Sequence, residues 1–179
     1  MDFSKGSSKS KRRSVIKWII YTLLLFVFYG LQTAPGFFRF LDAQPLLTIP
    51  LVLSIAMFEH EIGGAVFGIL AGFLWDMQQD TLFGFNALVM MCCCVSVSLL
   101  IMYLMPTTLP SSLFYNFSVL AIQSGLYFLF CYALWGTPGM SLVWVNYLLP
   151  QMGLTLLASI PIYFLVRLIS SKFSESLRS

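Results

Sequence analysis

The chain has 179 residues, of which 59% are hydrophobic and only 9% are charged, and its formal net charge is +3. This number of charged residues is too small to cover the surface of a water-soluble fold. The composition therefore excludes a soluble globular protein and predicts a multi-pass helical membrane protein. The net charge does not indicate nucleic-acid binding, because the basic residues, apart from Arg39, are divided between the two ends of the chain and lie on no aromatic platform.

The first 15 residues are rich in Ser, Lys and Arg, and they predict a flexible basic tail. No Lys or Arg occurs in residues 40–166. Basic residues next to a membrane span stay in the cytoplasm, so this distribution predicts that both ends, including a short tail at 171–179, are cytoplasmic. Four basic residues near the first span are expected to contact anionic lipid headgroups. They are Lys11, Arg12, Arg13 and Lys17.

Six apolar segments within residues 16–170 each predict a transmembrane helix. In chain order they are 16–33, 46–58, 62–75, 83–105, 113–135 and 143–168. A helix needs about 20 apolar residues to cross the hydrocarbon, so the second and third segments are short, and they are either tilted spans or a re-entrant pair. The second segment contains or follows Pro45 and Pro50, and it begins as early as Leu41 if these prolines lie in its first turn. In the sixth segment, Pro150 predicts a bend.

Three glycines in the third segment recur every four residues: Gly64, Gly68 and Gly72. Four residues advance a helix by about 400°, so these glycines form a narrow strip on one face, here called the glycine strip. Such strips let two helices approach closely in lipid. The glycine strip therefore predicts either packing within the bundle or a surface for a partner's span.

Two carboxylates, Asp76 and Asp80, flank a short polar turn after the glycine strip. Asp76 continues the four-residue series, and we expect it to accept backbone N–H groups of the turn and to fix its shape. Asp80 or Thr81 is expected to cap the next helix. Two carboxylates four residues apart lack the other oxygen ligands that Ca²⁺ or Mg²⁺ requires, so no metal site is predicted.

The remaining polar residues do not form a recognisable catalytic set. Glu59, His60 and Glu61 are interpreted as a solvated cytoplasmic loop, with docking of a basic partner segment as the alternative. His60 is the only histidine and lies outside the spans, so no nucleophile–base pair is predicted. The consecutive cysteines 92–94 point about 100° apart on a helix and cannot converge on one metal. We therefore predict a non-enzymatic protein without a cofactor.

The order of these elements resembles the MreD family of bacterial rod shape-determining proteins. In that family a Pro-led span is followed by a glycine-spaced helix, an Asp, a short turn, a Gly and a further apolar helix. The matching positions are Pro45, Gly64, Gly68, Gly72, Asp76, Gly84 and Asn86. The chain departs from the family at Leu46, where an acidic residue is common.

The resemblance implies an all-α integral membrane protein of about six transmembrane helices in the bacterial cytoplasmic membrane, similar to the substrate-binding subunits of energy-coupling-factor transporters. It implies a non-enzymatic subunit of the cell-elongation machinery that binds and orients the scaffold MreC, and through it joins MreB, RodA and an elongation penicillin-binding protein. Gly84 and the glycine strip are then helix-packing or partner-binding residues, and Asp76, Asp80 and Asn86 are polar, turn-fixing residues. A homodimer stays open.

The alternative function is a ligand-binding membrane subunit of an energy-coupling-factor-type vitamin transporter. The residues that would bind the ligand in this alternative are the amide side chains within the apolar segments, namely Asn86, Asn116, Gln123, Asn146 and Gln151. In lipid such amides are expected to hydrogen-bond to other helices. They either hold the bundle together or line a polar pocket at its centre.

Overall fold

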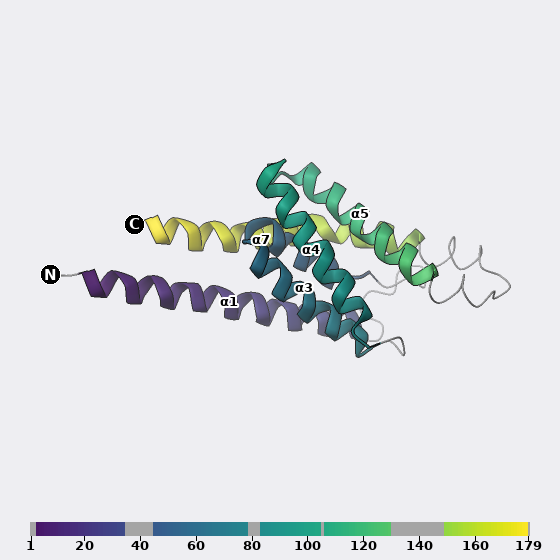
Figure 1. The fold of residues 1–179 in the computed structure, drawn as a ribbon, viewed down its shortest axis with the longest axis horizontal. Coiled ribbons are helices and arrows are strands. Elements are labelled where there is room, and N and C mark those ends of the chain that lie inside the picture. Colours follow the sequence, from purple (N-terminus) through teal and green to yellow (C-terminus); the bar gives the residue numbers. More distant parts are fainter. Residues whose placement is uncertain (1–2, 35–44, 79–82, 105, 130–148, 179) are drawn as a thin grey trace.

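The computed structural model describes residues 3–34, 45–78, 83–104, 106–129 and 149–178. Within these ranges all regular secondary structure is helical (Figure 1). The helices are α1 (Phe3–Thr33), α2 (Thr48–Phe58), α3 (Glu61–Asp76), α4 (Phe85–Tyr103), α5 (Leu109–Phe128) and α7 (Leu149–Arg178). The two termini lie at the same end of the molecule (Figure 1).

Three of the described helices contain a stretch long and apolar enough to cross a membrane. These stretches are Ser14–Thr33 in α1, Phe85–Tyr103 in α4 and Leu149–Phe173 in α7. Large apolar side chains on the outward face of α1 are exposed, among them Ile19, Leu23 and Phe26. An exposed apolar face on a helix of this length suits lipid, and the fold fits a helical membrane protein.

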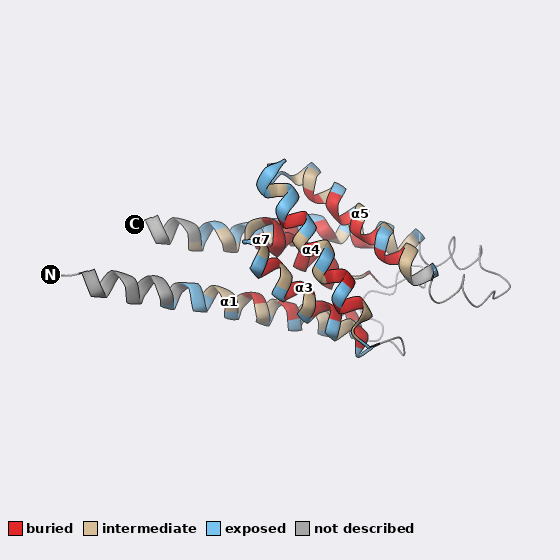
Figure 2. Ribbon diagram, in the orientation of Figure 1, coloured by how far each residue is buried: buried red, intermediate tan, exposed pale blue. Residues whose placement is uncertain are grey.

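The short helix α2 forms the centre of the bundle. It contacts each of the other described helices, α1, α3, α4, α5 and α7. Residues 48–57 are all buried, which agrees with a sequence that is apolar on every side of the helix. Buried residues on α3, α4 and α5 face inward, whereas the exposed residues lie on outward faces (Figure 2).

Helix bounds follow the predicted segments most closely in the middle of the chain. The segment predicted at 62–75 is α3, and the one at 83–105 contains α4. Helix α5 begins at Leu109, ahead of the predicted residue 113, because Pro110 is tolerated in a first helical turn, where an N–H would have no partner. Residues 130–135 of that segment lie outside the described residues.

The two ends of the chain differ from the prediction. Helix α1 begins at Phe3, so residues 3–15 are helical where a flexible tail was predicted, and α7 continues through 171–178. Ser, Lys and Arg are compatible with a helix once a neighbouring apolar span has formed the first turns. The bend predicted at Pro150 involves residues 143–148, which lie outside the described residues. Pro161 is inside α7 and removes one N–H donor from that helix.

Candidate functional site

The glycine strip packs against this chain's own helices. A Cβ built on Gly72 would overlap Cα of Ala87 in α4, and one on Gly68 would lie 2.9 Å from the carbonyl oxygen of Met90. A Cβ on Gly64 would lie 2.9 Å from Cβ of Ala56 in α2. All three glycines are buried. The geometry agrees with the first interpretation, in which the glycine strip packs within the bundle. The strip is not exposed to a partner's span.

A further close approach involves Gly63, which the four-residue spacing did not single out. A Cβ on Gly63 would lie 2.7 Å from Cη2 of Trp18 in α1. Trp18 also stacks on Phe67, with ring centroids 5.7 Å apart. Helix α3 therefore presents small residues to α1 as well as to α4, and the ring of Trp18 packs against α3.

The carboxylate of Asp76 ties the end of α3 to the start of α4. Asp76 is 3% exposed, and its Oδ2 accepts hydrogen bonds from the backbone N–H groups of Gly84 at 2.9 Å and Ala87 at 3.3 Å. Its Oδ1 accepts the backbone N–H of Asn86 at 3.2 Å and the Asn86 side-chain amide at 2.8 Å. A negative charge at a helix N-terminus is favourable, so Asp76 caps α4 from the preceding helix. Asp80 and Thr81, the predicted caps, lie outside the described residues.

Gly84 contributes a backbone conformation to this turn. It is the N-cap residue of α4 and has φ of +94°, a region that side chains other than glycine rarely adopt. A Cβ built there would meet none of the described residues within 4 Å. Among the described residues Gly84 therefore serves the turn and not a close approach between helices, and its role in partner binding stays a prediction.

A chain of buried amides extends from Asp76 into the bundle. An ionised carboxylate only accepts hydrogen bonds, so the Asn86 side chain donates to Asp76 and presents its Oδ1 to the next group. That oxygen accepts the Gln123 Nε2–H at 2.5 Å, which joins α4 to α5. Asn116 donates to the carbonyl oxygen of Ser112 at 2.9 Å. Among the described residues, Gln123 Oε1 and Asn116 Oδ1 have no hydrogen-bond partner.

The other predicted amides are less informative. Gln151 lies in the first turn of α7 and is half-buried, whereas Asn146 lies outside the described residues.

Lys17 is directed into the protein. Its Nζ lies 2.5 Å from Oε1 of Glu59, and the Tyr21 hydroxyl donates to the same oxygen at 3.1 Å. The side chains of Lys17 and Glu59 are only 16% and 11% exposed. The structure thus pairs Lys17, which was predicted to contact lipid headgroups, with Glu59, which was predicted to lie in a solvated loop. Arg12 is exposed, and the side chains of Lys11 and Arg13 lie outside the described set.

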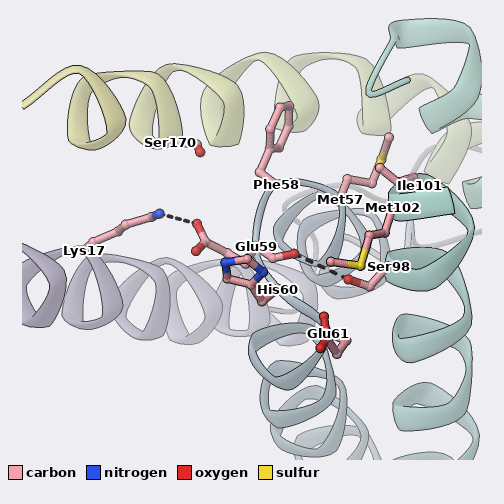
Figure 3. Close-up of a pocket in the computed structure, with 10 residues that line it drawn as sticks. All are labelled: Lys17, Met57, Phe58, Glu59, His60, Glu61, Ser98, Ile101, Met102 and Ser170. Atoms are coloured by element: carbon pink, nitrogen blue, oxygen red, sulfur yellow. Dashed lines mark hydrogen bonds and ion pairs between the residues drawn. The ribbon is translucent and has the colours of Figure 1, made fainter. Parts of the chain in front are cut away.

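This ion pair borders a cavity of about 330 Å³ at the end of the bundle where the termini lie (Figures 1 and 3). Its lining comes from α1, α2, the α2–α3 loop, the start of α3, α4 and α7: Lys17, Met57, Phe58, Glu59, His60, Glu61, Ser98, Ile101, Met102 and Ser170. Ser98 donates to the carbonyl oxygen of Glu59 at 3.4 Å, which holds the loop against α4 (Figure 3). The loop predicted to be solvated is thus one wall of a polar cavity.

Among the described residues, no group of three or more His, Cys, Asp or Glu side chains is placed so that it could hold a metal ion. Cys92 is exposed, Cys93 is half-buried and Cys94 is buried, as three successive positions on one helix require. Comparisons of the chain with protein-family models, with curated proteins and with solved structures find no match.

Proposed function

We propose that this chain is a non-enzymatic membrane subunit of the bacterial cell-elongation machinery that binds and orients the scaffold MreC. In this proposal it crosses the cytoplasmic membrane about six times with both termini in the cytoplasm, in the arrangement shared with the substrate-binding subunits of energy-coupling-factor transporters. MreB, RodA and an elongation penicillin-binding protein are reached through MreC. The outward apolar faces of the helices meet lipid.

The observation behind the proposal is the ordered series Pro45, glycine strip, Asp76, Gly84 and Asn86. In the structure the series from the strip onward forms one unit, in which α3 and α4 touch along the glycines and are joined at the turn by Asp76. A motif resemblance in which the positions from the glycine strip onward have structural roles is better support than one in which the residues are scattered. The series therefore favours the family whose element order it follows.

The glycine strip itself is not the proposed contact with MreC, because α4 covers it. Its role in this proposal is to build a rigid α3–α4 pair that holds the outward faces of the bundle in place. The partner's span then packs on one of those outward faces. In this arrangement, substitutions in the glycine strip unfold the protein, whereas substitutions on the outward face that contacts MreC release the partner.

Cell shape tests the proposal. Depletion of the chain in its own host should convert rods into rounded cells, and expression of the unaltered chain should restore rods. The Gly72→Leu variant should not restore them, because the added side chain has no space against α4. Rods that persist after complete depletion would argue against a role in elongation.

A second function, a ligand-binding subunit of a vitamin transporter, is favoured by one observation. Gln123 Oε1 and Asn116 Oδ1 are buried acceptors without partners among the described residues, and such atoms call for a donor. Native mass spectrometry of the chain extracted in mild detergent should show a retained small molecule if this function is correct. A bare chain that brings MreC with it would decide for the first proposal.

A further inference from the structure

One oxygen of the Glu59 carboxylate is left without a hydrogen bond inside the protein. Lys17 Nζ and the Tyr21 hydroxyl both bond to Oε1, and within the described part of the chain nothing bonds to Oε2. An ionised carboxylate has room for about four donors on its two oxygens. The side chain is 11% exposed, and Oε2 is not one of the buried atoms without a partner, so this oxygen is accessible from the cavity. A carboxylate held in this way favours an additional donor.

The cavity beside Glu59 has the features of a site for a cation on an alkyl chain. Met57, Ile101 and Met102 supply apolar walls, against which the methylene groups of a Lys or Arg side chain can pack. Helices α2 and α4 both end here, at Phe58 and Tyr103, and the C-terminal end of a helix favours positive charge.

The charges that line the cavity do not cancel. The described lining contains two carboxylates, Glu59 and Glu61, and one ammonium group, that of Lys17, and its one other titratable side chain is His60. The N-terminus of α3, at Glu61, contributes some positive potential that the Glu61 carboxylate offsets. With His60 neutral, the lining keeps one net negative charge. An incoming ammonium or guanidinium group would therefore be attracted.

The cavity lies at the depth where a neighbouring membrane span would carry its Lys or Arg side chains. It lies at the end of the bundle that holds both basic termini, which the proposed topology puts in the cytoplasm (Figure 1). Membrane spans as a class have Lys and Arg at their cytoplasmic ends. A single span packed beside this bundle would thus bring its basic flank to the depth of Glu59 and Glu61.

We propose that the cavity between α1, α2, α4 and α7 binds a Lys or Arg side chain from the cytoplasmic flank of a single-span partner. The incoming group donates to Glu59 Oε2, and Glu61 supplies the second counter-charge. This inference rests on the proposed function, in which the chain holds a partner's span. Lys17 already occupies one oxygen of Glu59 and therefore competes with the partner for its charge.

The test uses the full chain in nanodiscs of uncharged phosphatidylcholine, so that anionic lipid does not compete. The probes are two synthetic peptides with the same Leu-rich span, one with three Lys at one end and one with three Gln. The Lys peptide should bind about fivefold more tightly than the Gln peptide, since a hydrogen bond to a charged group contributes about 1 kcal/mol or more. Glu61→Gln should remove most of this preference.

The matched variants are Lys17→Met and Arg12→Met, each of which removes one positive charge from α1. Arg12 is exposed and has no place in the cavity lining. If the cavity is the site, Lys17→Met frees Glu59 and strengthens Lys-peptide binding by a further severalfold, whereas Arg12→Met changes it little. Equal effects of the two variants, or no preference between the peptides, would overturn the proposal.

Capture of MreC separates this inference from the proposed function. If MreC is recovered equally well with the unaltered chain and with Glu61→Gln, the cavity does not bind MreC, and the proposed function is unaffected. If the chain prefers the Lys peptide but no MreC is recovered from native membranes, the proposed function is contradicted, and the cavity is still supported as a site for basic flanks of membrane spans.

Discussion

Asp76 at the end of α3 accepts the backbone N–H of Gly84 at 2.9 Å, across a turn in which Gly84 has φ of +94°. The carboxylate also accepts the N–H groups of Asn86 and Ala87, so one side chain satisfies three of the first donors of α4. These donors would otherwise lack partners at a buried helix end. The pairing of a left-handed glycine with a buried carboxylate therefore sets the angle at which α4 returns along α3.

Replacing Asp76 tests this turn. Asp76→Ala should lower the free energy of unfolding by about 3 kcal/mol, because a buried cap and a charged acceptor are lost together. Asp76→Asn keeps one acceptor oxygen and should lose less. Thermal unfolding in mild detergent, followed by circular dichroism, measures both variants. An Ala variant as stable as the unaltered chain would contradict the capping role.

Gly84 should respond to conformation and not to size. Gly84→Ala should cost about 1 kcal/mol, because a Cβ is disfavoured at positive φ although it meets no neighbour here. Gly84→Asn should be less harmful, since Asn tolerates this region better than other side chains. The same unfolding measurement ranks the two variants, and the opposite order would show that close packing, not φ, is what matters at this position.

The glycine strip should show a graded response to a single methyl group. Gly72→Ala should destabilise most, by about 3 kcal/mol, because the new atom meets the α4 backbone at Ala87, which cannot move aside. Gly64→Ala meets mainly the side chain of Ala56 and should cost less. Gly125→Ala is the control, because no described residue lies within 4 Å of the added Cβ, and it should stabilise the helix by up to about 1 kcal/mol. Equal midpoints for all three would mean that α3 and α4 are not in close contact.

The ion pair of Lys17 and Glu59 should show coupling in a double-mutant cycle. Lys17→Met and Glu59→Gln should each destabilise the chain, because each leaves a largely buried group without its partner. The double variant should be more stable than the sum of the single effects predicts, with a coupling of about 1 kcal/mol after allowance for the partial exposure of both groups. Strictly additive effects would show that the pair does not form in the membrane.

The sequence reveals those parts of the site that depend on local spacing. Gly64, Gly68, Gly72 and Asp76 lie four residues apart, so their common face follows from helix geometry alone. The expectation that Asp76 accepts backbone N–H groups of the turn agrees with its hydrogen bonds to Gly84 and Ala87, because the bonded residues follow closely in the chain.

Contacts between distant residues could not be predicted in the same way. Lys17 and Glu59 lie 42 positions apart in the sequence, and their pairing depends on how α1 lies against the α2–α3 loop. Each residue alone has the pattern of an exposed charge, so both were assigned to solvent or lipid. Likewise, nothing near Gln123 indicates that Asn86 is its partner. The helical residues 3–15 were missed because their charge suggests disorder, whereas the adjoining span supports a continuous helix.

The central claim is that this chain holds the span of MreC in the membrane, and co-purification from native membranes tests it most directly. The tagged chain is extracted from its own host in mild detergent, and the proteins retained with it are identified and quantified, with Gly125→Ala as a folded control. The account predicts MreC in amounts comparable to the chain itself, with both the unaltered protein and the control. Intact, folded chain recovered repeatedly without MreC would contradict it.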